Sequence, residues 1–295
     1  MTYELYKILF CLRHGHTTEH QCRDGFWKKR QKFGGNFMME IEKGVKFYFD
    51  LKDELCYQIF VRDFEKNERA FVNSFLRPGD IFFDIGANIG LFTVLGAAKV
   101  APQGSVHAFE PLREPAENLR KNVRINNMSK LVLVNCFGLS DKKGVQKIWQ
   151  CEEGFSAFSS MGKPILDTGS RMTEIEVKVE MLDHYVDAHK ISQIALIKMD
   201  VEGWEHKVLE GASRTLTAQS PVILIEFTDG AAANAGSSTL ALRQKLESMG
   251  YRFYEWNDRD KKLEAHNVHQ KYGYKNLIAC KSTHVIEDRM GICIA

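Results

Sequence analysis

A carboxylate, an amide and two glycines come together in the segment 84–90, which reads Asp-Ile-Gly-Ala-Asn-Ile-Gly. Gly86 and Gly90 allow the backbone to turn tightly and to approach a ligand, and the helix expected after them offers free N–H groups. The next expected strand ends at Glu110, 20 residues after Gly90, where a carboxylate can accept hydrogen bonds from both hydroxyls of a ribose. This spacing predicts a site for a nucleoside-containing ligand.

The identity of that ligand follows from Asp84 and Asn88. The dinucleotide pattern requires three glycines as G-x-G-x-x-G, but Asn88 stands at the middle position and no third glycine follows at the required distance. The Asp84 carboxylate would repel a pyrophosphate, whereas it would attract the ammonium of an amino acid. A ligand with an amino-acid end and a ribose end is S-adenosylmethionine. The alternative is structural: Asp84 caps the turn and the glycines serve chain geometry alone.

A second group of carboxylates follows the strand expected over 194–199. Asp200 and Glu202 come directly after this strand, and Glu226 lies on the strand expected over 221–227. In a doubly wound sheet both strand ends face the ligand crevice. We therefore predict that Asp200, Glu202 and Glu226 orient an acceptor group or take its proton. Two alternatives stay open: the three carboxylates also suit Mg²⁺, or they serve a helix N-terminus and buried backbone groups.

Four segments together resemble the FkbM-type S-adenosylmethionine-dependent methyltransferases. They are the segment 84–90, Phe109-Glu110-Pro111, the block 198–205 (Lys-Met-Asp-Val-Glu-Gly-Trp-Glu) and Ile225-Glu226. The resemblance covers about residues 70–228, and the block 198–205 is the most family-specific part of it.

The resemblance implies roles for individual residues. Those that it places around the methionine end of the cofactor are Asp84, Gly86, Asn88 and Gly90. Glu110 would bind the ribose, and the segment 135–141, with Asn135 and Gly138, would lie near the adenine. Gly138 stands where an alanine is common in the family, and Trp204 stands where a small residue is common.

The elements that must position these residues alternate along the chain. Short apolar runs at 81–83, 105–109, 131–134, 194–199 and 221–227 are expected as strands, and 91–100, 115–126, 205–216 and 239–249 as helices. Further strands are expected at 251–255, at 276–280 and, within a longer insert over 141–190, at 174–181. This alternation predicts an α/β fold with a doubly wound, mostly parallel sheet covered by helices on both faces. Glu205 is then expected on a helix surface.

The start of the chain has a different character. We expect residues 1–70 to form an N-terminal region that covers the active site or supports a homodimer, and residues 71–295 to form the methyltransferase domain. The spacing of phenylalanines over 57–76 predicts one helix near the boundary. The segment 23–33 mixes five cations with three aromatics and is interpreted as a solvated basic face with aromatic rings packed beneath it.

Two weak chemical signals also lie in this region. Arg13-His14-Gly15 resembles the first motif of histidine phosphatases, but no second histidine with a matching context is evident. The spacing of the potential zinc ligands is not one of the common structural ones; these ligands are Cys11, His14, His16, His20 and Cys22. We interpret this segment as a flexible polar N-terminus.

The composition limits the partners. Lys and Arg number 40 against 38 Asp and Glu, so no strong overall attraction to nucleic acid or to an anionic membrane is expected. No apolar run approaches the ~18–20 residues of a membrane span, and the N-terminus lacks the order of a secretory signal. The seven cysteines are widely scattered and odd in number, which favours reduced thiols in a cytoplasmic protein.

These observations predict an enzyme that transfers a methyl group from S-adenosylmethionine to a hydroxyl of a small molecule, sugar or peptide, with an amide or amine nitrogen as the less favoured acceptor. Two alternatives from other classes are an NAD-dependent oxidoreductase on a similar fold and a binding protein with an inactive methyltransferase site. Asn88 and the missing third glycine oppose the first alternative, and the complete loop with its acidic residues opposes the second.

Overall fold

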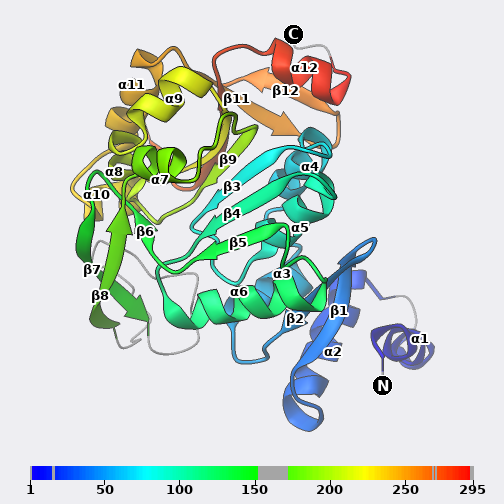
Figure 1. Cartoon of the computed structure of the whole chain (residues 1–295). Coiled ribbons are helices and arrows are strands. Elements are labelled where there is room, and N and C mark those ends of the chain that lie inside the picture. Colours follow the sequence, from blue (N-terminus) through cyan, green and yellow to red (C-terminus); the bar gives the residue numbers. More distant parts are fainter. Residues whose placement is uncertain (1, 15–16, 152–171, 268, 270, 293–295) are drawn as a thin grey trace.

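The computed structural model describes residues 2–14, 17–151, 172–267, 269 and 271–292 (Figure 1). Its centre is an eight-stranded sheet with the strand order β12-β11-β13-β10-β9-β3-β4-β5. Five neighbouring strands, from β10 to β5, run parallel, and β13 lies antiparallel between β10 and β11. This confirms the predicted α/β fold with a mostly parallel sheet. The strands are β3 (Ile81–Ile85), β4 (Ser105–Phe109), β5 (Val132–Asn135), β9 (Leu196–Met199), β10 (Val222–Phe227), β11 (Arg252–Asn257), β12 (Lys262–Ala265) and β13 (Lys275–Cys280).

Helices cover both faces of the sheet because successive strand residues point to opposite sides. Phe82 belongs to one apolar core, under α5 (Leu91–Val100) and α6 (Arg113–Ile125), and Phe83 belongs to the other. The second core lies under α7 (Leu182–Ala188), α8 (Glu205–Glu210), α9 (Ser213–Gln219) and α11 (Thr239–Ser248). The remaining helices of this part of the chain are α10 (Asp229–Asn234) and α12 (His284–Met290).

Two helices that were expected to be continuous are divided. The segment predicted as one helix over 205–216 forms α8 and α9, with Gly211 packed so closely against Ser140 that a Cβ would lie 2.0 Å from the Ser140 carbonyl oxygen. The segment 57–76 contains α3 (Glu54–Arg62) and α4 (Lys66–Phe75). Asp63 and Glu65 adopt left-handed backbone conformations between them, with φ of 55° and 48°, and this reverses the chain.

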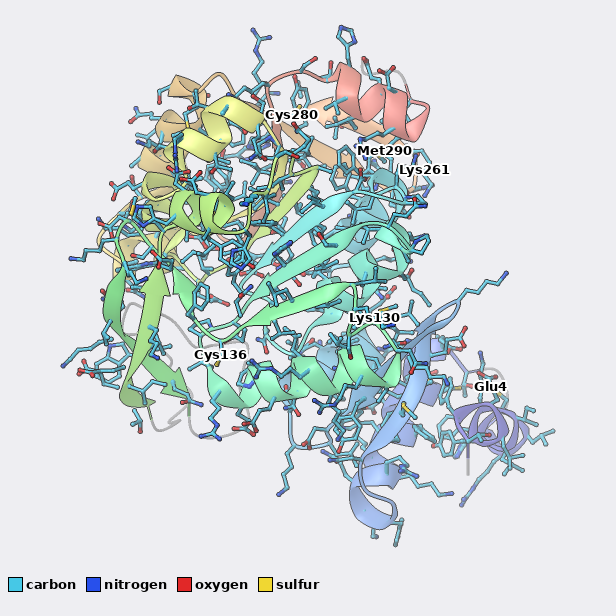
Figure 2. All side chains as sticks on the ribbon, in the orientation of Figure 1. Glu4, Lys130, Cys136, Lys261, Cys280 and Met290 are labelled. Atoms are coloured by element: carbon cyan, nitrogen blue, oxygen red, sulfur yellow. The ribbon has the colours of Figure 1, made fainter. Side chains whose placement is uncertain are left out.

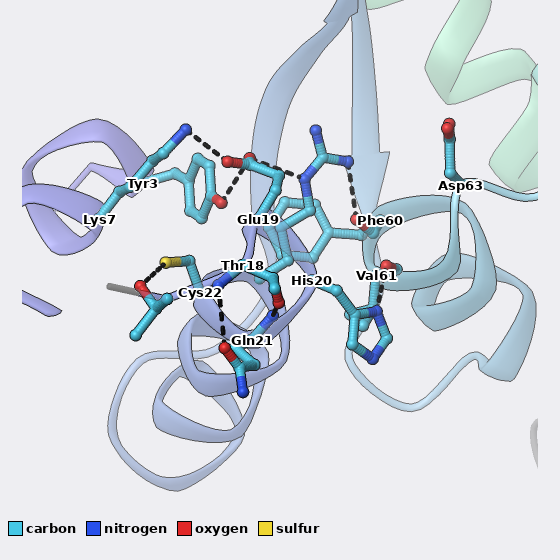
Figure 3. A network of polar contacts seen from close by, with 12 residues as sticks. Tyr3, Lys7, Thr18, Glu19, His20, Gln21, Cys22, Phe60, Val61 and Asp63 are labelled. Atoms are coloured by element: carbon cyan, nitrogen blue, oxygen red, sulfur yellow. Dashed lines mark hydrogen bonds and ion pairs between the residues drawn. The ribbon is translucent and has the colours of Figure 1, made fainter. Parts of the chain in front are cut away.

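The first residues are helical, so the prediction of a flexible N-terminus is wrong. Glu19 joins α1 (Tyr3–His14) to α2 (Glu19–Phe33), since its carboxylate binds the ammonium of Lys7, the hydroxyl of Tyr3 and the guanidinium of Arg23 (Figure 3). Arg23 also donates to the Phe60 carbonyl oxygen at 2.9 Å, which fixes α2 on α3.

The basic segment 23–33 forms most of α2 and has the expected two-sided character. Phe26 and Trp27 are each 3% exposed and pack into the core, while Lys28 and Lys29 are exposed. The His20 ring donates a hydrogen bond from Nδ1 to the Val61 carbonyl oxygen, 3.0 Å away, and therefore helps to dock α2 (Figure 3).

A two-stranded hairpin, β1 (Phe37–Glu42) and β2 (Val45–Phe49), attaches the N-terminal region to the main sheet's helices. The backbone N–H groups of Tyr48 and Lys46 donate to the side-chain oxygens of Asn122 and Asn126 on α6, each at 2.8 Å. These amides satisfy part of the free edge of β2, which would otherwise be open to pairing with another strand.

The insert between β5 and β9 forms a small three-stranded sheet at the margin of the molecule (Figure 1). Its strands are β6 (Gly138–Leu139), β7 (Gly144–Cys151) and β8 (Met172–Glu180), and β8 confirms the strand expected at 174–181 apart from its ends. The segment 152–171 of this insert lies outside the described residues.

Five cysteines of the described chain are free thiols, and Figure 2 shows two of them, Cys136 and Cys280, on well-separated parts of the ribbon. The sulfurs of Cys11 and Cys22 lie 4.0 Å apart between α1 and α2. Within the described residues, no helix combines the length and the apolar character that a membrane crossing requires.

Candidate functional site

A cavity that opens to solvent at its mouth lies at the carboxyl ends of β3, β4 and β9. After β3 the chain builds β4 and β5 on one side and then returns to build β9 and β10 on the other, so β3 and β9 flank the switch point of the sheet. This is where doubly wound sheets bind their ligands. The predicted site residues that line the cavity are Asp84, Gly86, Asn88, Glu110, Gly138, Asp200 and Glu202. The structure places Gly90, Asn135 and Glu226 outside this lining.

The loop after β3 is fastened to the neighbouring strand β4. The backbone N–H groups of Gly86 and Ala87 both donate to the Phe109 carbonyl oxygen at 3.0 Å. Gly86, Asn88 and Gly90 all have left-handed φ values, of 81°, 47° and 91°. A Cβ on Gly86 would lie 1.7 Å from the carbonyl oxygen of Asp200. Glycine is therefore required at position 86 because the backbone passes close to the end of β9. The sequence had suggested that the backbone passes close to the ligand instead.

Gly90 serves the packing of two helices. A Cβ at this position would lie 2.8 Å from the Leu119 side chain on α6. Gly90 thus allows α5 and α6 to pack closely, and it does not line the cavity.

Asp84 is fully buried at the end of β3 and has one unsatisfied oxygen. Its Oδ2 accepts a hydrogen bond from the Thr93 hydroxyl at 2.5 Å, and its Oδ1 has no hydrogen-bond partner among the described residues. Burial raises the pKa of Asp84 against the opposing effect of the Lys198 ammonium. The Asn88 side-chain oxygen is likewise buried and unpartnered within the described chain. Two free acceptors in one cavity wall suit a ligand that brings N–H donors.

Glu110 is held in a fixed orientation by the backbone. Its two carboxylate oxygens accept from the N–H groups of Asn88 and Leu112, each at 2.9 Å, and the side chain is 6% exposed. Burial raises the pKa of Glu110 to about 7. Each oxygen keeps a second lone pair, so the carboxylate can still accept hydrogen bonds from the two hydroxyls of a ribose.

Asn135, expected near the adenine, has its side chain engaged elsewhere. Its amide donates to the Ala108 carbonyl oxygen at 3.2 Å and to the Tyr185 hydroxyl at 3.1 Å. Its backbone carbonyl oxygen accepts from the Glu110 N–H at 3.0 Å. Asn135 thus positions Glu110, whereas Gly138 lies on the cavity wall itself.

The acidic residues after β9 surround a buried lysine, which sequence reasoning missed. The Lys198 ammonium donates to Asp200 Oδ2 at 2.9 Å and lies 4.7 Å from the centre of the Phe92 ring. Burial alone would lower the pKa of Lys198, but Asp200, Glu65 and Asp84 raise it above its usual range. Lys198 therefore carries a positive charge inside the cavity wall. The block 198–205 contained this residue, and its position on a strand before two carboxylates was the available signal.

Asp200, Glu202 and Glu226 lie together, with carboxylate oxygens within 4.8 Å of one another. Burial acts against ionisation of Asp200, but Lys198 and a hydrogen bond from Glu226 hold its pKa below the usual value. Burial and the charge of Asp200 raise the pKa of Glu226, which therefore keeps its proton. Burial also raises the pKa of Glu202 well above its usual value.

The trio is a poor magnesium site in this arrangement. The Lys198 ammonium, 2.9 Å from Asp200 Oδ2, already supplies Asp200 with the positive partner that a cation would provide. Mg²⁺ prefers a shell of ionised oxygens and water. We therefore derive no step through a metal ion.

Glu205 is buried, which contradicts its expected place on a helix surface. It is 4% exposed, and its Oε1 accepts from the N–H groups of Val201 and Gly203 at 3.0 and 3.3 Å. Burial raises its pKa to about 7. Glu205 thus fixes the turn that carries Glu202, whose φ of 52° is left-handed.

The N-terminal region contributes Leu55, Phe64 and Glu65 to the cavity wall. Sequence reasoning assigned this region a covering role without naming these residues. The N-terminal residues considered as zinc ligands do not form a metal-binding group among those that the structure describes; Gly15 and His16 lie outside the described residues.

Comparison with known proteins places this geometry in a family. A family model described as the methyltransferase FkbM domain matches residues 84–253, more than half of the chain. The chain belongs to the FkbM methyltransferase family. The match begins at Asp84 and includes every predicted site residue. The matched segment therefore contains the loop after β3, Glu110 and the three carboxylates Asp200, Glu202 and Glu226.

Two relatives of known name each match about half of the chain, and the chain spans less than two thirds of the length of either. The 31-O-demethyl-FK506 methyltransferase FkbM of Streptomyces tacrolimicus is 33% identical over 46% of this chain and 60% of its own length. The hexuronic acid methyltransferase AglP of Haloferax volcanii is 27% identical over 49% of this chain and 55% of its own length. A solved structure of an FkbM methyltransferase from Methylobacillus flagellatus is 18% identical, with a TM-score of 0.44 over 70% of this chain and 47% of that one.

Proposed function

We propose that this protein transfers the methyl group of S-adenosylmethionine to a hydroxyl oxygen of a small molecule or sugar. The observation that carries the proposal is the family match over residues 84–253, the segment that lines most of the cavity. Relatives named for methyl transfer to 31-O-demethyl-FK506 and to a hexuronic acid support an oxygen acceptor. Family membership opposes the NAD-dependent alternative, and a catalytically inactive binding protein is an outcome that the assay below would reveal.

The residues present suit the cosubstrate. The unpartnered oxygens of Asp84 and Asn88 would accept from the ammonium of its methionine end, and Glu110 would accept from the ribose hydroxyls. S-adenosylmethionine supplies an electrophilic methyl group when it is bound.

The three carboxyl groups of Asp200, Glu202 and Glu226 would have different roles in the transfer. Methyl transfer is an in-line displacement, so the protein must hold the acceptor oxygen in place and take its proton. Asp200, ionised beside Lys198, is suited to orient the acceptor hydroxyl. Glu202 lines the same cavity wall and, in its ionised form, would accept the proton as the O–C bond forms and the S–C bond of the sulfonium breaks. Because burial raises the pKa of Glu202, this ionised form becomes more populated as the pH rises. Glu226 keeps its own proton and donates to Asp200, which holds that carboxylate in place.

Calorimetric titration with S-adenosylhomocysteine, NAD and NADP tests the cosubstrate. We expect binding of S-adenosylhomocysteine alone. Glu110→Ala should weaken that binding by about ten- to hundredfold, because hydrogen bonds to charged groups contribute roughly 1.5–3 kcal/mol. Glu117→Ala is the matched control, since Glu117 is an exposed carboxylate on α6 that pairs with Arg113. Binding of NAD without S-adenosylhomocysteine would overturn the proposal, and equal affinities of the two variants would remove Glu110 from the site.

A further inference from the structure

Glu65 reaches the cavity from outside the family-matched segment. It precedes α4 in a left-handed conformation, and its side chain makes no capping hydrogen bond to that helix. Its Oε1 instead accepts from the Tyr274 hydroxyl at 2.7 Å and from the Asn276 amide at 3.3 Å. Asn276 also donates to the Tyr274 oxygen at 3.0 Å. Two side chains at the start of β13 therefore hold one oxygen of Glu65 and fix the direction of the other.

The second oxygen of Glu65 has no hydrogen-bond partner in the part of the chain that the structure describes. Glu65 Oε2 is buried and lacks a hydrogen bond to any described residue, although Glu65 lines the cavity. Native proteins rarely leave a buried carboxylate oxygen without a donor, because the lost hydration is costly. Since Tyr274 and Asn276 both serve Oε1, the donor for Oε2 is expected from a ligand in the cavity.

Glu65 faces the acceptor side of the cavity. Its donor Asn276 stands opposite Glu226 in the pairing of β13 with β10, and the charge of Glu65 also raises the pKa of Glu202. The proposed cosubstrate contacts, Asp84 and Glu110, lie on the β3 and β4 side. Glu65 thus acts on the residues that we propose orient and deprotonate the acceptor.

Carboxyl groups outnumber ammonium groups on the cavity wall. Among the described residues that line it, one carries an ammonium, Lys198, and that ammonium is paired with Asp200. The lining residues that carry carboxyl groups are Glu65, Asp84, Glu110, Asp200 and Glu202. Burial raises the pKa of Glu65 and that of Glu110 to about 7, so both are ionised at pH 8.5. At that pH the wall has an excess of negative charge, which disfavours an acceptor that carries a carboxylate or a phosphate.

We propose that Glu65 Oε2 accepts a hydrogen bond from a hydroxyl of the acceptor, so that the site selects a neutral, polyhydroxylated sugar and rejects its uronic acid counterpart. This inference rests on the proposed function of the same site and narrows the class of its substrate. Glu65 is then a specificity-determining residue supplied by the N-terminal region, with Tyr274 and Asn276 as its positioning residues.

The test uses the full chain with S-adenosylmethionine at pH 8.5 and a panel of neutral hexose and pentose methyl glycosides, each paired with its uronic acid. Formation of S-adenosylhomocysteine is the readout. We expect turnover of a neutral glycoside and at least tenfold lower kcat/KM for the matched uronic acid. Glu65→Gln should raise KM for the neutral glycoside by about tenfold, leave kcat within about twofold and reduce the discrimination against the uronic acid.

Glu68→Gln is the matched control, because Glu68 lies on α4 and does not line the cavity. It removes a neighbouring negative charge and should leave KM and discrimination unchanged. Tyr274→Phe removes one donor to Glu65 and should raise KM by a few-fold with the carboxylate retained, which keeps the test valid if Glu65→Gln melts early.

The outcomes separate the two proposals. A wild-type protein that does not bind S-adenosylhomocysteine contradicts the proposed function. A protein that binds it but turns over no neutral glycoside, or that prefers the uronic acid, overturns the assignment of a neutral sugar. Equal KM values for Glu65→Gln and Glu68→Gln overturn the role of Glu65 alone.

Discussion

Gly86→Ala is expected to damage both stability and cosubstrate binding, and Gly79→Ala provides a control with the same backbone strain. The two glycines have left-handed φ values of 81° and 91°. A left-handed conformation costs a non-glycine residue roughly 1–2 kcal/mol. At Gly79 a Cβ would meet nothing within 4 Å, whereas at Gly86 it would lie 1.7 Å from the Asp200 carbonyl oxygen and 2.8 Å from the carbonyl carbon.

The difference between the two variants measures the contact between the loop and β9. Gly79→Ala should lower the free energy of unfolding by about 1–2 kcal/mol through strain alone. Gly86→Ala should add an overpacking cost of about 1–3 kcal/mol, since backbone atoms must move apart. Because Asp200 belongs to the ion pair with Lys198, this movement also displaces the acidic trio.

Denaturant unfolding gives the two free energies, and calorimetric titration with S-adenosylhomocysteine gives the affinities. We expect Gly79→Ala to bind as the wild type does and Gly86→Ala to bind at least tenfold more weakly. If both variants lose the same stability and both keep full affinity, the explanation of Gly86 by its contact with Asp200 is wrong.

Three further predictions concern the carboxylates. Glu202→Gln and Asp200→Asn should each slow single-turnover methyl transfer by roughly 10²–10⁴-fold, the range for loss of a general base or a positioned partner. EDTA should not change the rate of the wild type. Full activity in both variants would reject the roles of Asp200 and Glu202 in methyl transfer. Glu226→Gln retains an N–H donor toward Asp200, so its melting temperature and activity should stay close to wild type, whereas Glu226→Ala should lower both; equal damage would contradict the protonated state of Glu226. The folded-state pKa of Glu205 is raised from 4.5 to about 7, so the folded protein binds this proton more tightly than the unfolded chain does. The resulting contribution to the free energy of unfolding is complete below about pH 4.5 and is lost as the pH rises through about 7. Urea denaturation between pH 5 and 8 should show this decline, with a shallower slope for Glu205→Gln, and an unchanged slope would refute the shift.

Local sequence pattern predicted the elements near the cavity well. The helix Leu91–Val100 and the strand Ser105–Phe109 have the bounds that were expected, because each is a mostly apolar run that a buried element accommodates. The acidic trio was also brought together as expected, since the carboxyl ends of neighbouring parallel strands meet at one edge of a sheet.

The misjudged features depend on contacts between distant segments. Glu205 looks like a typical acidic residue at a helix start, and its burial arises from the preceding turn, whose N–H groups it binds. The division of the helix over 57–76 depends on left-handed Asp63 and Glu65. Glutamate rarely adopts this conformation, and aspartate signals it far less strongly than glycine does. Glu65 and Tyr274 are 209 residues apart, so no spacing rule could have joined them.

The hydrogen bonds that fasten the loop after β3 have an entropic consequence. Gly86 and Ala87 are tied to the Phe109 carbonyl oxygen, and Asn88 is tied to Glu110, before any ligand arrives. Ordering a free residue costs roughly 1–2 kcal/mol of backbone entropy, and here folding has already met that cost for three successive residues. Ligand binding to this loop therefore costs little additional conformational entropy, so a larger share of the free energy of the contacts contributes to the affinity.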